Sequence, residues 1–217
     1  MPRKKPRPYH HGDLARALRT EALALLAEVG PEALTLREVA RRAGVSHTAP
    51  YRHYPDKRAL LTAIAVEATD LLADTLRTAL ADAGPDLRSR FLAAGHAYVR
   101  FSVDHRARFR TMFLTSEIDP TSPELVKAGE ECFSILLAYI ADAQEAAFFA
   151  PGEPMQIAVA VWAMHQGLAA LAESGSLQKI GELRAVSDAS HARLLDGLLA
   201  RTPPAAEPAT RARRSRR

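Results

Sequence analysis

The chain has 217 residues, of which 47% are apolar and 25% are charged, and this balance excludes wholesale disorder. Cys132 is the single cysteine, so the chain forms neither an internal disulfide nor a multi-cysteine zinc site. The first apolar stretch follows a basic, proline-rich start and is interrupted by charges. We therefore expect no secretory signal and a cytoplasmic location.

The net charge of +4 is unevenly distributed along the chain. Residues 1–8 and residues 202–217 each carry +4, whereas residues 9–58 carry +2 and residues 59–201 carry −6. Basic arms attract phosphate backbones or anionic membranes without sequence preference. We expect both ends to be disordered basic arms, which either contact DNA or serve only as solvated tails.

Apolar residues recur with helical period in nearly every segment, and strand signals are almost absent. Glycine and proline pairs such as Gly30-Pro31 and Gly84-Pro85 mark helix ends. The sequence therefore predicts an all-α fold of about nine helices. Their expected ranges are 13–29, 35–43, 46–51, 56–81, 87–104, 106–115, 123–149, 154–174 and 182–200.

Local signals refine three of these helices. Thr35 and Glu38 have the spacing of a capping box, in which each side chain satisfies a backbone N–H, and Asp56 is placed to cap the helix that follows it. Pro50 lies inside the very short third helix, where it removes a hydrogen bond and disfavours helical geometry at Ala49. We interpret that helix as an element that presents side chains.

Three helices in the first 54 residues, with a turn at Gly44 between the second and the third, are typical of a helix-turn-helix. In that motif the third helix lies in the DNA major groove and the second crosses the backbone. Thr35 and Lys57 are placed at helix N-termini and suit phosphate contacts. The other candidate DNA contacts are Arg37, Ser46, His47, Thr48, Tyr51, Arg52 and His53.

Residues 34–61, LTLREVARRAGVSHTAPYRHYPDKRALL, resemble the DNA-binding signature of the tetracycline-repressor (TetR) family of bacterial transcription regulators. The match covers about residues 9–72 and rests on the blocks T-x-R-E-V-A, A-G-V-S and Y-R-H-Y-P-D-K. The resemblance implies that the first three helices bind DNA, that the fourth leads to a helical regulatory domain, and that the last two long helices form a homodimer.

The resemblance also implies roles for single residues. Tyr51 and Lys57 would contact phosphates, His53 would lie at the backbone rim, and Tyr54 would pack inward; Pro50 departs from the leucine that is commoner at its position. Ser46, His47 and Thr48 would face bases or adjacent phosphates, while Val45 and Ala49 would mostly pack. The expected domains are a basic arm at 1–8, a DNA-binding domain at 9–58 with its motif at 35–54, a regulatory domain at 59–201 and a basic tail at 202–217.

The resemblance further implies a small-molecule ligand in the regulatory domain. Its Trp162–Gly167 segment resembles a Trp, His, Gly pattern of one subclass, although His165 follows Trp162 by three residues and not by four, a rotation of about 100° on a helix. Packing at an interface is the alternative for both residues. The ligand candidates are His96, Arg100, Phe101, Phe109, Phe113, Phe133, Trp162, His165 and Gln166, with Cys132, Tyr139 and Met164 beside them.

Two of these candidate groups have other interpretations. Most of the phenylalanines suit a plain helical core, because a bundle needs them for burial. His96 and Arg100 share one helix face, and if buried they would need a partner such as an acidic ligand. Cys132 follows Glu130 and Glu131, whose carboxylates would raise the pKa of its thiol.

Residues 154–172 carry no formal charge and are long enough to span a membrane. Gln156, His165 and Gln166 lie inside this stretch, which argues against insertion. A helix that is apolar on all sides is buried in a soluble protein. We therefore expect a subunit interface and no membrane partner.

The sequence thus favours a homodimeric repressor that binds a palindromic DNA operator and leaves it when a small molecule binds. The alternative on the same fold is a nonspecific, nucleoid-associated DNA-binding protein or a partner-binding adaptor, which the arginine-rich tail suggests. No G-x-S-x-G, P-loop or dinucleotide motif occurs, and no histidine pair with an acidic third member has metal-ligand spacing on one segment. We expect no catalysis, no metal and no cofactor.

Overall fold

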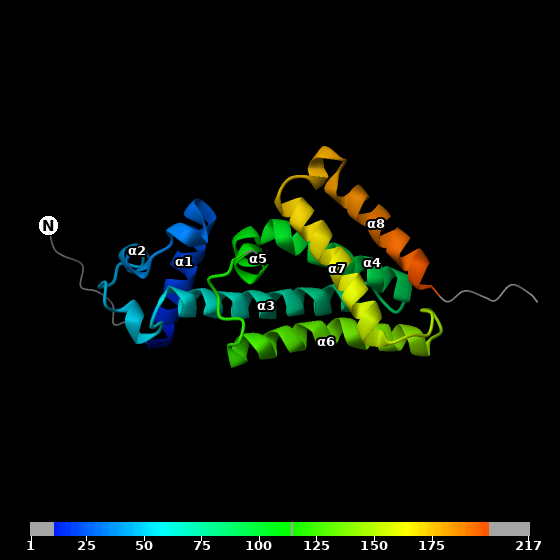
Figure 1. The fold of residues 1–217 in the computed structure, drawn as a ribbon, viewed down its shortest axis with the longest axis horizontal. Helices are drawn as coiled ribbons and strands as arrows, with labels where there is room; N and C mark the ends of the chain where they lie inside the picture. The colour runs from blue at the N-terminus through cyan, green and yellow to red at the C-terminus, as the bar shows by residue number, and fades with distance from the viewer. Residues whose placement is uncertain (1–10, 114, 200–217) are drawn as a thin grey trace, which may run out of the picture.

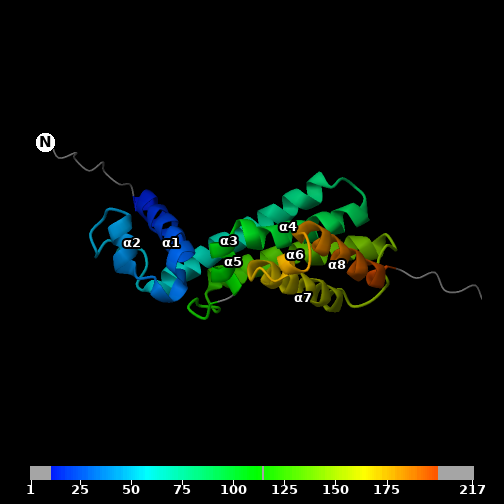
Figure 2. The same cartoon turned by 90° about the horizontal axis from the view of Figure 1, so that it is seen from above.

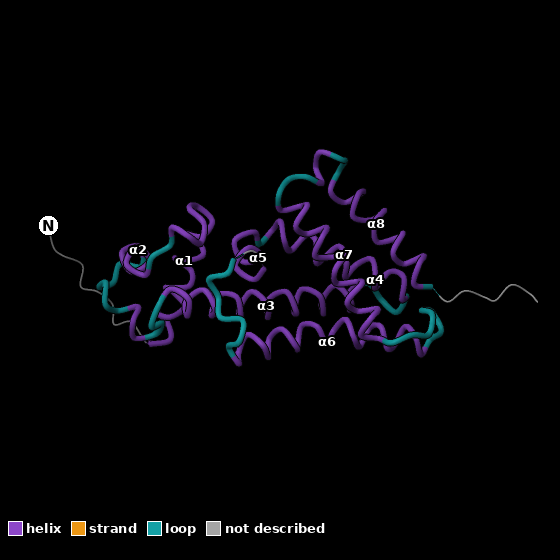
Figure 3. The backbone as a smooth tube through the Cα atoms, viewed as in Figure 1, coloured by secondary structure: helices purple, strands orange, loops and turns teal. Residues whose placement is uncertain are grey.

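The computed structural model describes residues 11–113 and 115–199 (Figure 1). The two basic ends at 1–8 and 202–217, and the expectations placed on them, lie outside the described residues. Within those residues the chain is all helical, as the sequence predicts, with short loops between the helices (Figure 3). The elements are α1 His11–Ala33, α2 Leu36–Arg42, η1 Pro50–Arg52, α3 Lys57–Asp82, α4 Leu87–Asp104, α5 Arg106–Phe113, α6 Pro123–Glu145, α7 Pro154–Glu173, η2 Leu177–Lys179 and α8 Leu183–Leu198.

The N-terminal unit is built around one apolar cluster to which α1, α2 and the start of α3 contribute. Leu18 and Leu25 of α1, Val39 of α2 and Leu60 of α3 are fully or almost fully buried in it. Gly30 has a φ of 76° and interrupts the helical backbone, so the first straight helix ends where the glycine-proline pair predicts.

The third short helix differs from expectation. Residues 44–49 form turns, and only Pro50–Arg52 are helical, as a 3-10 helix. The backbone closes by tight hydrogen bonds, from the Ala49 N–H to the Ser46 carbonyl at 3.0 Å and from the His53 N–H to the Pro50 carbonyl at 2.9 Å. Pro50 offers no N–H of its own, so an α-helical ladder cannot pass through it. Ala49, however, is helical at φ −62° and ψ −40°, contrary to the expectation from the proline that follows it.

Helix α3 is the long rod that joins the two ends of the molecule (Figures 1 and 2). Asp56 caps it, because its Oδ1 accepts a hydrogen bond from the Ala59 N–H at 2.8 Å. Its 26 residues span about 39 Å, from the N-terminal unit into the C-terminal bundle. Helix α6 runs alongside α3 in Figure 1 and packs against it, and α4 packs against α3 and also against α7 and α8.

Helix α6 ends at Glu145, four residues before the predicted end. Ala147 has a φ of 53°, and the chain turns so that the N–H groups of Phe148 and Phe149 both donate to the Ala143 carbonyl. Phe149 is buried by this turn in the cluster that holds Phe91. Burial of the aromatic ring therefore overrides the helical period of the sequence here.

Helix α7 contains the uncharged stretch noted in the sequence. It is the one helix among the described residues that is long and apolar enough to cross a membrane, a test that core helices of soluble proteins also pass. One face, with Val161, His165 and Leu168, is buried against the bundle. The other face exposes Met155, Val159, Trp162 and Leu171 by 40–48%.

Candidate functional site

The first candidate surface is formed by α2, the turns after it and η1, at the end of the molecule that is opposite α8 (Figure 1). Thr35 caps α2, since its Oγ1 accepts from the Glu38 N–H at 3.2 Å. The other half of the expected capping box does not form. The Glu38 carboxylate instead pairs with Arg41 at 2.6 Å and Arg42 at 3.3 Å, and these arginines lower its pKa to about 2.

The candidate DNA contacts divide cleanly from the residues that pack. Tyr54 is only 7% exposed and its hydroxyl accepts from Arg19 Nη1 at 2.6 Å, while Pro50 is buried and Val45 packs on the core. Tyr51, by contrast, is 55% exposed. The structure also leaves exposed Thr35, Arg37, Ser46, His47, Thr48 and Arg52, and it leaves His53 and Lys57 half-buried. These exposed side chains are the surface that we call the exposed polar face.

Lys57 has partners that the sequence does not suggest. It forms an ion pair with Glu117, and its Nζ also donates to the Glu32 carbonyl at 3.3 Å. Glu117 lies in the loop between α5 and α6, sixty residues along the chain from Lys57. No local pattern reveals a pair with that separation.

The α5–α6 loop docks on the N-terminal unit through its next two residues as well. Ile118 is 9% exposed and belongs to the same apolar cluster as Leu61 and Ile64. The Asp119 N–H donates to Thr62 Oγ1 at 2.8 Å. This loop therefore holds the start of α3 through apolar, hydrogen-bonded and ionic contacts.

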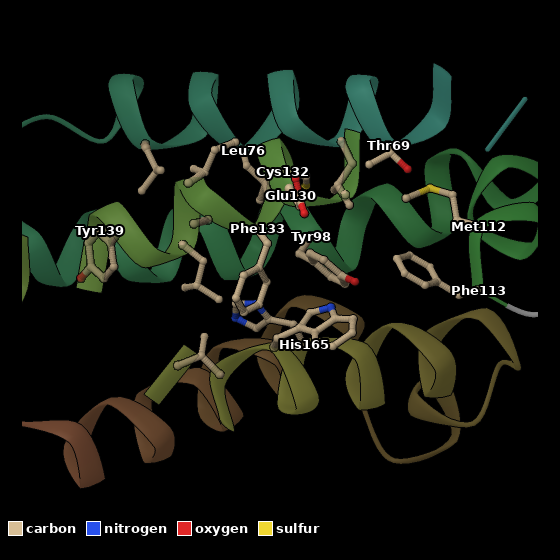
Figure 4. A pocket seen from close by; sticks show the side chains of 18 of the residues that line it. Thr69, Leu76, Tyr98, Met112, Phe113, Glu130, Cys132, Phe133, Tyr139 and His165 are labelled. Carbon is tan, nitrogen blue, oxygen red and sulfur yellow. The ribbon is translucent and has the colours of Figure 1, made fainter. Parts of the chain in front are cut away.

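The second candidate site is a cavity of about 480 Å³ inside the bundle (Figure 4). Its volume lies in the range of small-molecule sites, and its walls come from α3, α4, α5, α6 and α7. In Figure 4, Leu76, Tyr98, Phe133 and His165 converge on it from different helices. The lining residues are Thr69, Leu72, Leu76, Leu80, Phe91, Ala94, Tyr98, Met112, Phe113, Gly129, Glu130, Cys132, Phe133, Ile135, Leu136, Tyr139, Val161, Trp162 and His165.

The cavity brings together about half of the ligand candidates that the sequence suggests. Phe113, Phe133, Trp162 and His165 line it, as do Cys132 and Tyr139. Burial is the largest cause that raises the pKa of the Cys132 thiol, to about 11, and the neighbouring Glu130 and Glu131 are not among its causes.

Other ligand candidates lie elsewhere. Phe101 and Phe109 are buried in a core cluster outside the lining, and Met164 packs near Leu168 in another. Gln166 does not line the cavity, but its Oε1 accepts a hydrogen bond from the Tyr98 hydroxyl at 2.6 Å. Gln166 therefore fixes the position of the Tyr98 ring, which lines the cavity.

His96 and Arg100 do not face the cavity, and their partners are carboxylates of the chain itself. His96 pairs with Asp188 of α8. The exposed Arg100 pairs with Asp104 on its own helix at 2.9 Å. An acidic ligand was suggested for this pair only if both residues were buried; Arg100 is exposed, and Asp188 and Asp104 already supply the negative charge.

A group of three histidines lies behind the cavity wall, at the crossing of α4, α7 and α8. The His191 ring lies 5.0 Å from that of His165 and 6.0 Å from that of His96, between ring centroids. The Nε2 atoms of His165 and His191 are buried without a hydrogen-bond partner among the described residues. Burial, with a smaller effect of His191, lowers the pKa of His165 to about 3, and burial also lowers that of His191.

These histidines are not arranged as a metal centre. Across residues 11–113 and 115–199, no three His, Cys, Asp or Glu side chains are grouped so that they could hold a metal ion. Sequence reasoning did not single out His191, nor most of the cavity wall. Leu72, Leu76 and Leu80 have the same spacing as core residues. The hydrophobic period alone therefore does not distinguish residues that line a cavity from residues that fill a core.

Comparisons with known proteins agree on one family. The model of bacterial regulatory proteins of the tetR family matches residues 18–64, and the model of the tetracyclin repressor-like C-terminal domain matches residues 91–213. The class A tetracycline repressor from transposon 1721 of Escherichia coli is 42% identical over 77 residues, which are 36% of this chain and 34% of the repressor. The chain thus aligns with only about a third of that curated relative.

Solved structures extend the likeness to the whole fold. A protein of unknown function from Rhodococcus sp. RHA1 is 34% identical, with a TM-score of 0.80 over 89% of this chain and 100% of that one. The fatty acid degradation regulator FadR from Bacillus halodurans has a TM-score of 0.69 over 91% of this chain and 100% of its own, at 15% identity, and shows the fold alone. With both halves of the chain matched, the chain belongs to the tetracycline-repressor (TetR) family of DNA-binding transcription regulators.

Proposed function

We propose that the chain is a homodimeric repressor that binds a palindromic operator and leaves it when a small molecule occupies the cavity. The observation that carries this proposal is the continuity of α3. Lys57 at its first turn adjoins the exposed polar face, while Leu72, Leu76 and Leu80 on the same helix form a wall of the cavity. A ligand that shifts this wall shifts the end of α3 that adjoins DNA.

The exposed face supports the DNA-binding half of the proposal. Tyr51 and Lys57 contact phosphates and fix the docking, whereas His47 and Thr48 reach base edges in the major groove. Thr35 adds a phosphate contact at the N-terminus of α2. The acidic residues 59–201 would repel a duplex, which disfavours the alternative of a protein that wraps DNA nonspecifically.

The outer face of α7 supports the dimer. Val159, Trp162 and Leu171 are exposed although they are large and apolar, which marks a surface that a partner covers. A second copy of the chain is the occupant we propose, since paired recognition elements must reach successive major grooves about 34–36 Å apart. A ligand that favours another separation weakens DNA binding by the factor by which DNA weakens ligand binding.

The proposal is one of binding, without a catalytic step or a cofactor, and it implies a cytoplasmic location where the protein meets chromosomal DNA. Its test uses Tyr51→Ala and Lys57→Ala in mobility-shift titrations at several salt concentrations, with Lys127→Ala, an exposed lysine of α6 outside the candidate DNA contacts, as the matched control. Both variants should weaken binding to every sequence, and Lys57→Ala, which removes a cation, should also reduce the salt slope by about one. Affinities equal to that of Lys127→Ala would contradict the proposed docking.

A second experiment tests base readout. Binding-site selection with His47→Ala and Thr48→Ala should return motifs that differ from the parent motif, because these side chains reach the base edges. If both variants return the parent motif, the polar face does not read bases at these positions.

A further inference from the structure

Three polar side chains of the cavity wall already donate hydrogen bonds within the protein. The Tyr98 hydroxyl donates to Gln166 at 2.6 Å, and the Tyr139 hydroxyl donates to the Leu87 carbonyl at 2.7 Å. The Thr69 hydroxyl donates to the Ala65 carbonyl at 2.8 Å. None of these three donors is left for a bound molecule without breaking a bond that already exists.

His165 does not supply a charge to the cavity either. The residue is only 6% exposed, and its Nε2 atom is shielded from solvent, with the centroid of the His191 ring 5.0 Å from that of His165. With its pKa lowered to about 3 by burial, the imidazole is neutral at physiological pH. His165 therefore contributes ring surface to the wall and not a cation.

The charges around the cavity disfavour ions of either sign. Among the described lining residues there is no lysine or arginine, and Glu130 is the single charged side chain. Glu130 is exposed at the edge, where water screens its field. An anion would thus lose its hydration without gaining a counter-charge, and a cation would find its partner only outside the apolar space.

We propose that the cavity takes an uncharged, predominantly apolar ligand and discriminates against molecules that carry a carboxylate, a phosphate or an ammonium group. This inference rests on the proposed function only in taking the cavity as the effector site. The volume of the cavity limits the size of the ligand, since about 480 Å³ lies in the range of small-molecule sites.

The test measures binding without DNA. N-Phenyl-1-naphthylamine is an uncharged dye whose fluorescence rises in apolar surroundings, and Trp162, the single tryptophan, lines the cavity and reports a nearby dye by energy transfer. Three competitors share one alkyl chain and differ in charge: 1-dodecanol, dodecanoate and dodecylammonium, at pH 7.5 and below their micelle concentrations. We expect dodecanol to displace the dye at concentrations at least tenfold below those of either ion.

A charge placed in the wall tests whether the cavity is where these molecules bind. Leu76→Lys and, separately, Leu136→Lys put an ammonium group in the lining and should shift the preference toward dodecanoate, with Leu76→Met as the neutral control. Helical content by circular dichroism verifies that each variant folds.

Three results would overturn the inference: displacement by either ion as strong as that by dodecanol, no binding of dye or dodecanol, or unchanged preferences in both lysine variants. None of these results touches DNA binding. Conversely, if dodecanol binds in the cavity but does not release the protein from DNA, the result contradicts only the proposed release mechanism.

Discussion

At Gly95, a single hydrogen in place of a side chain decides how closely α4 approaches α8. A Cβ added there would overlap the imidazole of His191, which lies directly against this part of α4. Replacement by alanine should therefore lower the free energy of unfolding by about 1–3 kcal/mol through overpacking. Urea unfolding of Gly95→Ala measures the loss.

The effect of Gly95→Ala on the free energy of unfolding should change sign in the His191→Ala variant. In His191→Ala the obstructing ring is gone, and alanine is a better helix former than glycine by roughly 0.5–1 kcal/mol. Gly95→Ala should then be neutral or stabilising. An equal loss in both backgrounds would mean that His191 does not set the spacing of α4 and α8.

The buried histidines give the protein a defined response to acid. A histidine of the unfolded chain titrates near pH 6.5, whereas burial lowers the pKa of His165 to about 3 and also lowers that of His191. Above pH 6.5 both states hold these side chains neutral, so they add no pH dependence. Below pH 6.5 these histidines bind protons in the unfolded chain but stay neutral in the folded chain. The free energy of unfolding therefore falls by up to about 1.4 kcal/mol per unit decrease in pH for each histidine.

Urea unfolding at pH 7.5 and at pH 5.0 measures this response, in a window above the titration of most carboxylates. His165→Gln keeps a neutral polar group but removes one proton site, so it should lose less stability than the parent between the two pH values. The same loss in parent and variant would show that His165 is protonated in the folded state as readily as in the unfolded state.

At the scale of elements, the α5–α6 loop couples the two halves through Lys57. Its pairing with Glu117 engages the ammonium group that the proposed docking assigns to a phosphate. Glu117→Gln should therefore strengthen DNA binding about two- to fivefold at low salt, the range expected for a partly exposed ion pair. Mobility-shift titrations with one fixed operator measure the change.

The double variant shows whether Lys57 carries this effect. Combined with Lys57→Ala, the Glu117→Gln substitution should leave DNA affinity unchanged, since the group that it frees is absent. If Glu117→Gln strengthens binding equally in both backgrounds, its effect is a general gain of positive charge near DNA and not a release of Lys57.

The starts of α2 and α3 and the exposed side chains between them were predictable from the sequence, because their causes are local. Thr35 and Asp56 cap the helices they precede, and Tyr54 packs inward as the family resemblance implies. The α-helix expected at 46–51 was wrong, because Pro50 offers no N–H to an α-helical ladder and only Pro50–Arg52 are helical, as a 3-10 helix.

The cavity was only partly predictable. Phe133, Trp162 and His165 were singled out for their chemistry, whereas Leu76 and Tyr98 were not among the ligand candidates. His96 was a ligand candidate, but α8 brings the Asp188 carboxylate to it across the fold. Long-range partners of this kind have no signature in a single sequence, because they depend on which helices cross and at what register.

For the whole molecule, the outer face of α7 determines the oligomeric state in the proposed function. Val159→Glu places a carboxylate in the centre of the apolar surface and should produce a monomer in sedimentation velocity runs. Val126 on α6 is exposed to a similar extent, so Val126→Glu is the matched control and should remain a dimer. Dimers of equal stability from both variants would exclude α7 from the interface.

The central claim is that this chain is a sequence-specific dimeric regulator, and a footprint on the DNA that flanks its own gene tests it most directly. The purified protein is titrated at about 150 mM salt with excess random competitor DNA, conditions that suppress nonspecific binding. We predict a protected inverted repeat with half-sites about one helical turn, 34–36 Å, apart or a multiple of it. Protection that disappears with competitor on this DNA, together with no enriched motif in a genome-wide selection, would contradict the claim and leave a nonspecific DNA-binding protein.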